Sequence, residues 1–195
     1  MFKIMTPFGR IENKEAFIDH VRKLGVDWYP IINSDISFPD EPWIHPFRTE
    51  IGKMGTHPCF ECLNNFWASG TLVDDDYYVT LNDDDFLEEG FFDKLKHCTK
   101  DIIIVSMKRG MKPVPGNGQH GISTLYARPE ETKGGSMGGE QLIMKGKVCK
   151  NIAHKDDGCA DGVLIEQLYK QMPEQFEYVP DAYVLFNFLQ KGRWE

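Results

Sequence analysis

The chain has 195 residues, a length that suits a single domain and allows a core to be buried without disulfide bonds. Apolar residues make up 41% of the sequence, and 22 basic against 30 acidic residues give a net charge of −8. A pI near 5.3 argues against a surface for nucleic acid or anionic membranes, which needs a basic stripe, but small phosphorylated ligands can still bind through a bridging cation.

The N-terminus and the cysteines indicate where the protein acts. The first apolar stretch is short and is broken by Pro7 and Gly9, which is typical of neither a signal peptide nor a membrane-spanning helix. No later apolar run approaches the ~20 residues of a span, so we expect no transmembrane segment. Five cysteines, an odd number, disfavour a disulfide framework. We therefore expect a reducing, cytoplasmic setting.

The beginning of the chain predicts a β-α-β unit. Phe2–Met5 is a short apolar run that predicts a strand. Helical spacing of apolar residues follows, with Asn13 as the N-cap and Gly25 as the stop. Trp28–Ile32 predicts a second strand. This order predicts a parallel sheet with a crossover helix.

The rest of the chain continues with alternating strands and helices and contains no internal repeat, so we expect one domain over residues 1–195. Long loops are expected over residues 37–58, 109–121 and 133–139. The predicted helices are Cys62–Ser69, Phe86–His97 and Asp161–Met172, and the predicted strands are Tyr77–Leu81, Ile102–Val105 and Ile122–Tyr126. Gln141–Val148 is expected to form a strand or a short helix, and Phe176–Phe188 one or two strands interrupted by Pro180.

Six aspartates fall within the twelve residues from Asp74 to Asp85, in two triplets. The first triplet precedes a predicted strand, where a solvated loop explains it. The second triplet, residues 83–85, follows that strand and so lies where open α/β sheets bind ligands. Adjacent carboxylates repel one another, and a hard divalent cation such as Mg²⁺ or Mn²⁺ removes that penalty. In extended geometry Asp83 and Asp85 point to one side and Asp84 to the other. A solvated acidic turn is the alternative.

Four stretches of the first half, in order, carry a family resemblance: Ile4–Arg10, Ile31–Asp35, Asn64–Asn65 and Leu81–Asp85. They resemble the first strand with its nucleotide-contacting loop, the end of the second strand, a stretch lining the donor pocket and the Asp-x-Asp motif of GT-A glycosyltransferases, most like the family-2 type. The resemblance implies a Rossmann-like α/β fold of GT-A type, with a mixed, mainly parallel sheet flanked by helices. In that fold, residues 1–100 would bind the nucleotide sugar and residues 101–195 would face the acceptor.

The resemblance also implies roles for single residues. Asp83 and Asp85 would hold Mn²⁺ or Mg²⁺ on the diphosphate of the donor. Asn82 stands where the family often has an acid directly after the strand leucine, so Asp84 is the second candidate. The implied contacts with the nucleotide-sugar donor are Thr6, Pro7, Arg10, Asn33, Asp35, Asn64 and Asp84.

The second half of the chain resembles the family in two stretches. Gly134–Gly139 is similar to the glycine-containing stretch near the acceptor, and Asp161–Leu168 is similar to the acidic motif Asp-x-x-Leu-x-x-x-Leu that opens a helix. In inverting members that Asp is the general base, which implies this role for Asp161. Ala160 stands where the family usually has Glu, so Asp156 and Asp157 are the alternatives. A plain helix cap is the structural alternative for Asp161.

The predicted function is metal-dependent transfer of a sugar from a nucleotide-sugar donor, with a UDP-sugar favoured, to a glycan or another hydroxyl acceptor. A cation would act as a Lewis acid on the departing diphosphate, and a carboxylate within reach of the acceptor hydroxyl would take its proton. Two alternatives stay open. A sugar-nucleotide nucleotidyltransferase usually has a first loop richer in glycine than Thr6–Arg10, and a non-catalytic metal- or carbohydrate-binding module would lack the base. We interpret Cys59 and Cys62 as free thiols and not as zinc ligands, because Cys149 and Cys159 lack the Cys-x-x-Cys spacing.

Overall fold

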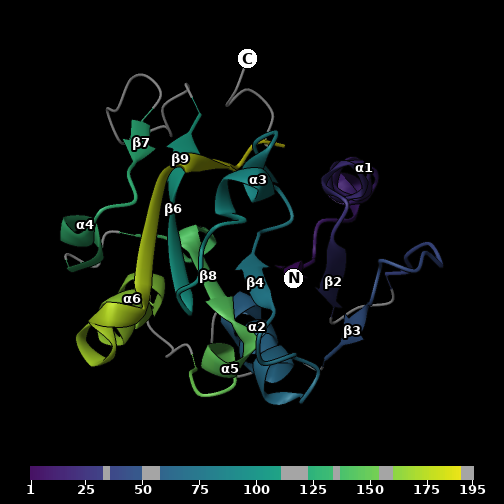
Figure 1. Ribbon diagram of the computed structural model, residues 1–195. Coiled ribbons are helices and arrows are strands. Elements are labelled where there is room, and N and C mark those ends of the chain that lie inside the picture. Colours follow the sequence, from purple (N-terminus) through teal and green to yellow (C-terminus); the bar gives the residue numbers. More distant parts are fainter. Residues whose placement is uncertain (33–35, 50–57, 111–122, 134–136, 154–159, 190–195) are drawn as a thin grey trace.

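A mixed β-sheet with helices on both faces is the framework of the protein in the computed structural model (Figure 1). The structure describes residues 1–32, 36–49, 58–110, 123–133, 137–153 and 160–189. The strand order is β3-β2-β1-β4-β8-β6-β9-β5, and β7 pairs with β6. The strands are β1 (Phe2–Pro7), β2 (Asp27–Ile32), β3 (Phe47–Arg48), β4 (Tyr77–Thr80), β5 (Phe86–Leu87), β6 (Ile102–Arg109), β7 (Ser123–Leu125), β8 (Leu142–Lys145) and β9 (Phe176–Phe186). The helices are α1 (Lys14–Leu24), α2 (Pro58–Ala68), α3 (Phe91–Leu95), α4 (Pro129–Lys133), α5 (Gly146–Cys149) and α6 (Ala160–Gln171), with 3-10 helices η1 (Ile11–Asn13), η2 (Gly139–Gln141) and η3 (Pro173–Gln175).

The predicted β-α-β opening is confirmed. Strand β1 pairs in parallel with β2 on one side and with β4 on the other, so these three strands end at one edge of the sheet. Helix α1 ends at Gly25, whose φ of 67° is the left-handed conformation that glycine adopts readily at a helix C-terminus. Asn13 precedes α1 as predicted but makes no capping bond, because its side chain donates to the Asp83 carbonyl oxygen at 3.0 Å. The start of α1 is thereby tied to the acidic segment after β4.

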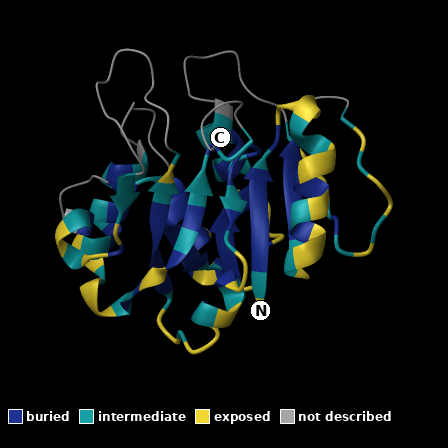
Figure 2. Cartoon of the chain, turned by 90° about the horizontal axis from the view of Figure 1, so that it is seen from above, coloured by how far each residue is buried: buried dark blue, intermediate teal, exposed yellow. Residues whose placement is uncertain are grey.

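Alternate residues of the central strands pack into two separate cores. Ile102 and Ile104 of β6 pack with α2, α5 and α6 on one face, whereas Ile103 and Val105 pack with α1 and α3 on the other. This alternation is what the pleat of a strand buried on both faces dictates. Figure 2 shows the result: the central strands are mostly dark blue, and the helices beside them turn yellow faces outward.

The structure corrects several predicted elements. Residues Phe86–His97 do not form one helix: Phe86 and Leu87 pair with β9, and Gly90, at a φ of 71°, precedes the short helix α3. Helix α2 begins earlier than predicted, and Gln141–Val148 forms both alternatives in succession, β8 and then α5. Strand β9 continues through Pro180, because its register against β6 shifts between Val105 and Ser106.

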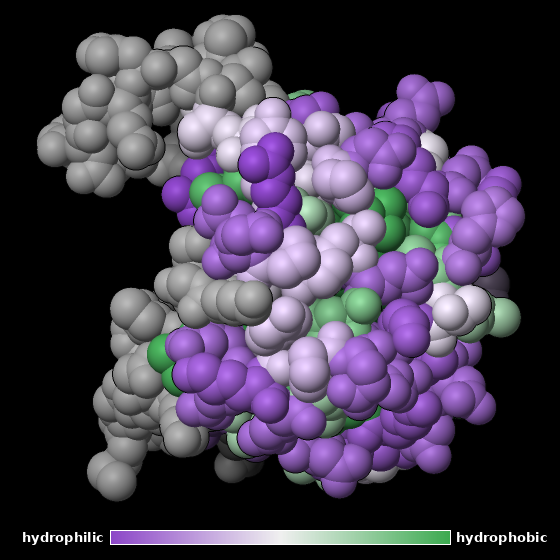
Figure 3. Space-filling model, turned by 60° about the vertical axis from the view of Figure 1, so that its left-hand side comes forward, coloured by the Kyte–Doolittle hydropathy of each residue, from purple (hydrophilic) through white to green (hydrophobic). Residues whose placement is uncertain are grey.

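The long ladders β1–β2 and β6–β9 are parallel, whereas β8 runs antiparallel to both of its neighbours, β4 and β6. The reversed direction of β8 places η2, which precedes it, at the edge of the sheet where the parallel strands end. The surface in Figure 3 is mostly hydrophilic over the described part, with small hydrophobic areas between. Among the described residues, none of the helices is long and apolar enough to cross a bilayer.

Candidate functional site

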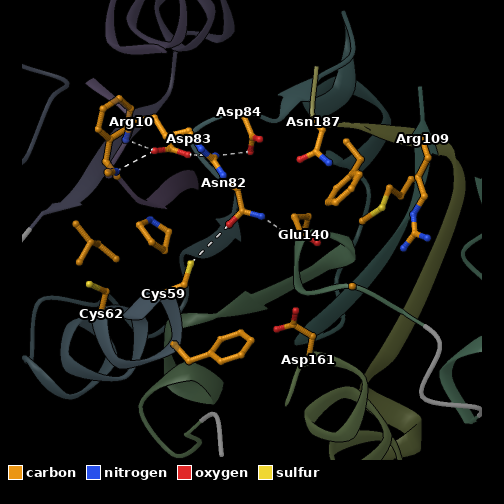
Figure 4. A pocket seen from close by; sticks show the side chains of 18 residues that line it. Arg10, Cys59, Cys62, Asn82, Asp83, Asp84, Arg109, Glu140, Asp161 and Asn187 are labelled. Atoms are coloured by element: carbon orange, nitrogen blue, oxygen red, sulfur yellow. Dashed lines mark hydrogen bonds and ion pairs between the residues drawn. The ribbon is translucent and has the colours of Figure 1, made fainter. Parts of the chain in front are cut away.

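A cavity of about 700 Å³ lies at the carboxyl ends of the parallel strands. The ends of β1, β2, β6 and β9, the turn after β4, and residues of α2, η2 and α6 line it (Figure 4). Open α/β sheets bind ligands at this edge, since loops leaving several strands converge there. The cavity gathers charged groups that lie far apart in the sequence: Arg10, Asp83, Asp84, Arg109, Glu140 and Asp161.

The acidic segment after β4 is a turn and not an extended strand end. The Asp85 amide donates to the Asn82 carbonyl oxygen at 3.1 Å, which closes a four-residue turn. As a consequence, the predicted alternation is wrong: Asp83 and Asp84 both line the cavity, whereas Asp85 does not. The side chains of Asp83 and Asp84 are only 6% and 2% exposed, so two carboxylates lie close together in the cavity wall, largely shielded from solvent.

Arg10 lies between these two carboxylates. One guanidinium nitrogen, Nη1, contacts both Asp83 Oδ1 and Asp84 Oδ1, the latter at 2.9 Å (Figure 4). The Asp83 carboxylate also accepts the backbone N–H groups of Gly9 at 2.8 Å and of Arg10 at 2.7 Å, both through Oδ2. Asp83 therefore has two roles here: it fixes the loop after β1, and with Asp84 it forms a pair that binds a cationic group.

Asp85 is buried behind the turn, at 0% exposure. Its Oδ1 accepts the Asn187 backbone N–H at 2.6 Å, and within the described part of the chain Oδ2 has no hydrogen-bond partner. Burial, and then the charge of Glu140, raise the pKa of Asp85 well above its ordinary value. This carboxyl ties the end of β9 to the turn after β4, and its position does not match the predicted role of a metal ligand facing the cavity.

Glu140 and Asp161 form a second acidic group in the cavity. Glu140 belongs to η2, and the Asn82 side-chain amide donates to its Oε1; Asp161 lies in the first turn of α6. Burial, and then the negative charge of Asp161, raise the pKa of Glu140 from 4.5 to about 7. Two glycines make room: a Cβ on Gly138 would lie 2.6 Å from Glu140 Oε2, and one on Gly139 would lie 2.7 Å from Asp161 Oδ1. Each glycine therefore allows a carboxylate to lie against the backbone of η2.

Asp161, which the sequence predicts as a site residue, lines the cavity, and so does Glu140, which the sequence analysis did not single out. A glycine pair directly before an acid and an apolar strand was the available signal, because small residues admit close neighbours. Arg109 also reaches the cavity from the end of β6, with its guanidinium carbon 5.5 Å from the centre of the Phe186 ring, and its charge lowers the pKa of Glu140. The acidic pair thus faces a cationic side chain.

The predicted donor contacts fall into three groups. Pro7, Arg10 and Asp84 line the cavity. Thr6 and Asn64 do not line it: the Thr6 hydroxyl is fully buried and accepts a bond from the Trp28 indole N–H at 3.0 Å. Asn33 and Asp35 lie outside the described residues, as do Asp156 and Asp157.

The cysteines of the described chain are free thiols. Cys59 and Cys62, one turn apart on α2, both line the cavity. Burial raises the pKa of Cys59 to about 12 and that of Cys62 to about 11. Thiols with such pKa values stay protonated at neutral pH and are poor nucleophiles. Among the described residues, no group of three or more His, Cys, Asp or Glu side chains has the geometry of a metal site.

Comparisons with known proteins identify the fold. No protein-family model and no curated protein matches the sequence. Among solved structures, TarS from S. aureus in complex with UDP-GlcNAc matches with a TM-score of 0.55 at 12% identity, over 94% of this chain and 58% of that chain. A 4-diphosphocytidyl-2C-methyl-D-erythritol synthase matches with a TM-score of 0.51 at 10% identity, over 86% of this chain and 84% of that one. The predicted fold class, a GT-A-type α/β fold with a mixed sheet flanked by helices, is confirmed, and the chain spans little more than half the length of the TarS structure.

Proposed function

We propose that the protein transfers a sugar from a nucleotide-sugar donor, with UDP-sugars favoured, to a hydroxyl acceptor. The observation that carries this proposal is one cavity with two separate acidic groups: Asp83 and Asp84 with the loop after β1 on one side, and Glu140 and Asp161 on the other. Glycosyl transfer needs two such groups, because a diphosphate must be stabilised as it leaves and a hydroxyl must lose a proton as it attacks. The fold likeness to a protein that binds UDP-GlcNAc supports the choice of donor.

On the donor side, the residues present fit a divalent cation. Asp83 and Asp84 offer hard carboxylate oxygens in the cavity wall, and the Arg10 guanidinium that contacts both is a stand-in for a positive ion. Asp83 and Asp84 would hold Mn²⁺ or Mg²⁺, which would supply positive charge for the diphosphate of the donor. Asp85 is left out of this set, because its carboxyl is buried away from the cavity. Pro7 and Arg10 would contact the nucleotide; Thr6 and Asn64 are left out because they do not line the cavity.

On the acceptor side, Asp161 would act as the general base. Asp161 lies in the first turn of α6, where the partial positive charge of a helix N-terminus favours a nearby carboxylate. The acceptor hydroxyl would bond to the anomeric carbon while the bond from that carbon to the diphosphate oxygen breaks, and the proton would pass to an Asp161 carboxylate oxygen. Attack from the face opposite the leaving group inverts the anomeric configuration.

A nucleotidyltransferase is the second candidate, favoured by one observation. The chain covers 84% of the cytidyl-transferring synthase structure that it resembles, but only 58% of TarS. A glycine-rich loop after the first strand would favour this candidate, whereas the loop Thr6–Arg10 contains only Gly9. Release of pyrophosphate from CTP or UTP in the presence of a sugar phosphate would identify this activity, and release of UDP from a UDP-sugar would identify the first.

The proposal is tested first by thermal shift with UDP and a panel of UDP-sugars, with Mn²⁺ or with a chelator. We expect the melting temperature to rise only with the metal present, and Asp84→Asn to abolish the rise. Asp75→Asn is the matched control, because Asp75 is an exposed aspartate before β4, outside the cavity. Equal shifts with metal and with chelator would refute the metal role.

The base is tested by release of UDP in the presence of candidate acceptors. Asp161→Asn should keep the donor-induced thermal shift and lose transfer by about a hundredfold or more, since general base catalysis contributes that much. Transfer at the wild-type rate would exclude Asp161 as the base. The anomeric configuration of the product, read by NMR, reports inversion or retention.

A further inference from the structure

Arg10 contacts the acidic pair through two chemically separate parts. Its backbone N–H donates to Asp83 Oδ2 at 2.7 Å, while its guanidinium contacts Asp83 Oδ1 and Asp84 Oδ1. The backbone bond and that of Gly9 hold the loop after β1, whatever the guanidinium does. The side chain can therefore leave the carboxylates without releasing the loop.

The exposures of Arg10, Asp83 and Asp84 also indicate that the arginine side chain can move while the two carboxylates stay in place. Asp83 and Asp84 are fixed in the wall at 6% and 2% exposure, whereas the Arg10 side chain is 47% exposed and reaches in from the solvent side. Like charges that are shielded from solvent repel strongly, so a positive group beside the two carboxylates stabilises them. A guanidinium provides that positive group when nothing else is bound, and a divalent cation would need the same oxygens.

A bound nucleoside diphosphate changes the competition between the Arg10 guanidinium and a divalent cation for the oxygens of Asp83 and Asp84. Guanidinium groups bind phosphate oxygens in a planar, bidentate manner, and Arg10 already lines the cavity where the diphosphate would lie. When the Arg10 guanidinium turns from the carboxylates to the phosphates, it leaves Asp83 Oδ1 and Asp84 Oδ1, and a divalent cation can contact these oxygens. The negative charge of the diphosphate favours binding of that cation. Loss of one positive contact at the carboxylates is then offset by a new one at the ligand.

We propose that Arg10 is a movable counter-ion that occupies the cation position between Asp83 and Asp84 and transfers to the diphosphate when the nucleotide binds. The inference rests on the proposed function for its ligand, and it assigns Arg10 a positioning role that sets the order of binding. The metal and the nucleotide then bind cooperatively: each is weak alone, and each strengthens the other by the same factor.

The test measures Mn²⁺ binding directly, from the electron paramagnetic resonance signal of free Mn²⁺, with and without UDP and with no sugar transfer involved. With Mn²⁺ alone, Arg10→Gln should bind at least tenfold more tightly than wild type, because the competing guanidinium is gone. UDP should tighten Mn²⁺ binding at least tenfold in wild type and by a clearly smaller factor in Arg10→Gln. Arg10→Lys keeps the positive charge but lacks the planar guanidinium, so its Mn²⁺ affinity should lie between those of wild type and Arg10→Gln. This variant guards against a folding defect in Arg10→Gln.

Arg22→Gln is the matched control. Arg22 is similarly exposed, at 51%, and pairs with Asp19 at 2.6 Å on α1, outside the cavity, so its loss should leave both titrations at wild-type values. Equal Mn²⁺ affinity of wild type and Arg10→Gln in the absence of UDP would overturn the inference, as would Mn²⁺ binding to neither protein with UDP present. Failure of the proposed function is a different result: Mn²⁺ and UDP bind as described, yet no UDP-sugar is consumed.

Discussion

Replacing Glu140 by Gln is predicted to remove a specific pH dependence of stability. Burial and the charge of Asp161 raise the pKa of this carboxyl from 4.5 to about 7 in the folded protein. The folded state therefore holds the proton more tightly than the unfolded chain, so the wild-type free energy of unfolding falls as pH rises from about 4.5 through 7. At 1.36 kcal/mol for each pKa unit, the loss between pH 5 and pH 8 is roughly 2 to 3 kcal/mol.

The assay is urea unfolding of wild type and Glu140→Gln at intervals between pH 5 and pH 8. Glutamine keeps the oxygen that accepts from the Asn82 amide and has no charge. The free energy of unfolding of the variant should therefore increase steadily relative to that of wild type as pH rises. Glu15→Gln is the control, because the Glu15 side chain is 81% exposed, and it should run parallel to wild type. Parallel curves for Glu140→Gln and wild type would contradict this prediction, since they would mean that Glu140 ionises equally in the folded and unfolded states.

Two further predictions concern Gly139, which lies beside the proposed base, and His20, which lies outside the cavity. Gly139→Ala places a Cβ 2.7 Å from Asp161 Oδ1, so the proposed base must move. We expect sugar transfer to fall by an order of magnitude or more, while the UDP-induced thermal shift stays. An unchanged transfer rate would contradict this prediction. His20 stacks on Phe86 at 3.9 Å between ring centres, and its Nε2 accepts the Leu87 N–H, a contact that needs the neutral ring. Burial, and then the charge of Lys23, lower the pKa of His20 to about 4, so stability is complete above pH 6.5 and falls by roughly 2 to 3 kcal/mol as pH drops through 4. NMR titration of the His20 ring checks the pKa, and a midpoint near 6.5 would contradict it.

The effects of Glu140 and His20 oppose each other in the acid range. Between pH 4.5 and 6.5, rising pH destabilises the protein through Glu140 and stabilises it through His20. The wild-type curve alone therefore does not separate the two groups. Single variants at each position do, because each removes one slope and leaves the other.

Much of the framework followed from local sequence patterns. The apolar, β-branched run Ile102–Val105 is typical of a strand buried on both faces, and the stop at Gly25 follows from the freedom of glycine at positive φ. The segment Phe86–His97 shows the limit of this approach. Its apolar residues have helical spacing, but Phe86 and Leu87 find strand partners in β9, about a hundred residues later, and no local pattern announces that pairing.

Local sequence patterns were enough to predict the alternation of strands and helices, the acidic segment after β4 and the aspartate in the first turn of α6. Which carboxylates face the cavity depends on the folded chain, because a turn closed by Asn82 and Asp85 replaces the extended geometry and brings Asp83 and Asp84 to the same cavity wall. The tertiary structure also brought in Glu140, through the antiparallel strand β8 whose preceding residues reach the same edge of the sheet. The physical reason is that side-chain direction and charge environment depend on chain segments remote in sequence, whereas strand and helix periodicity is set by near neighbours.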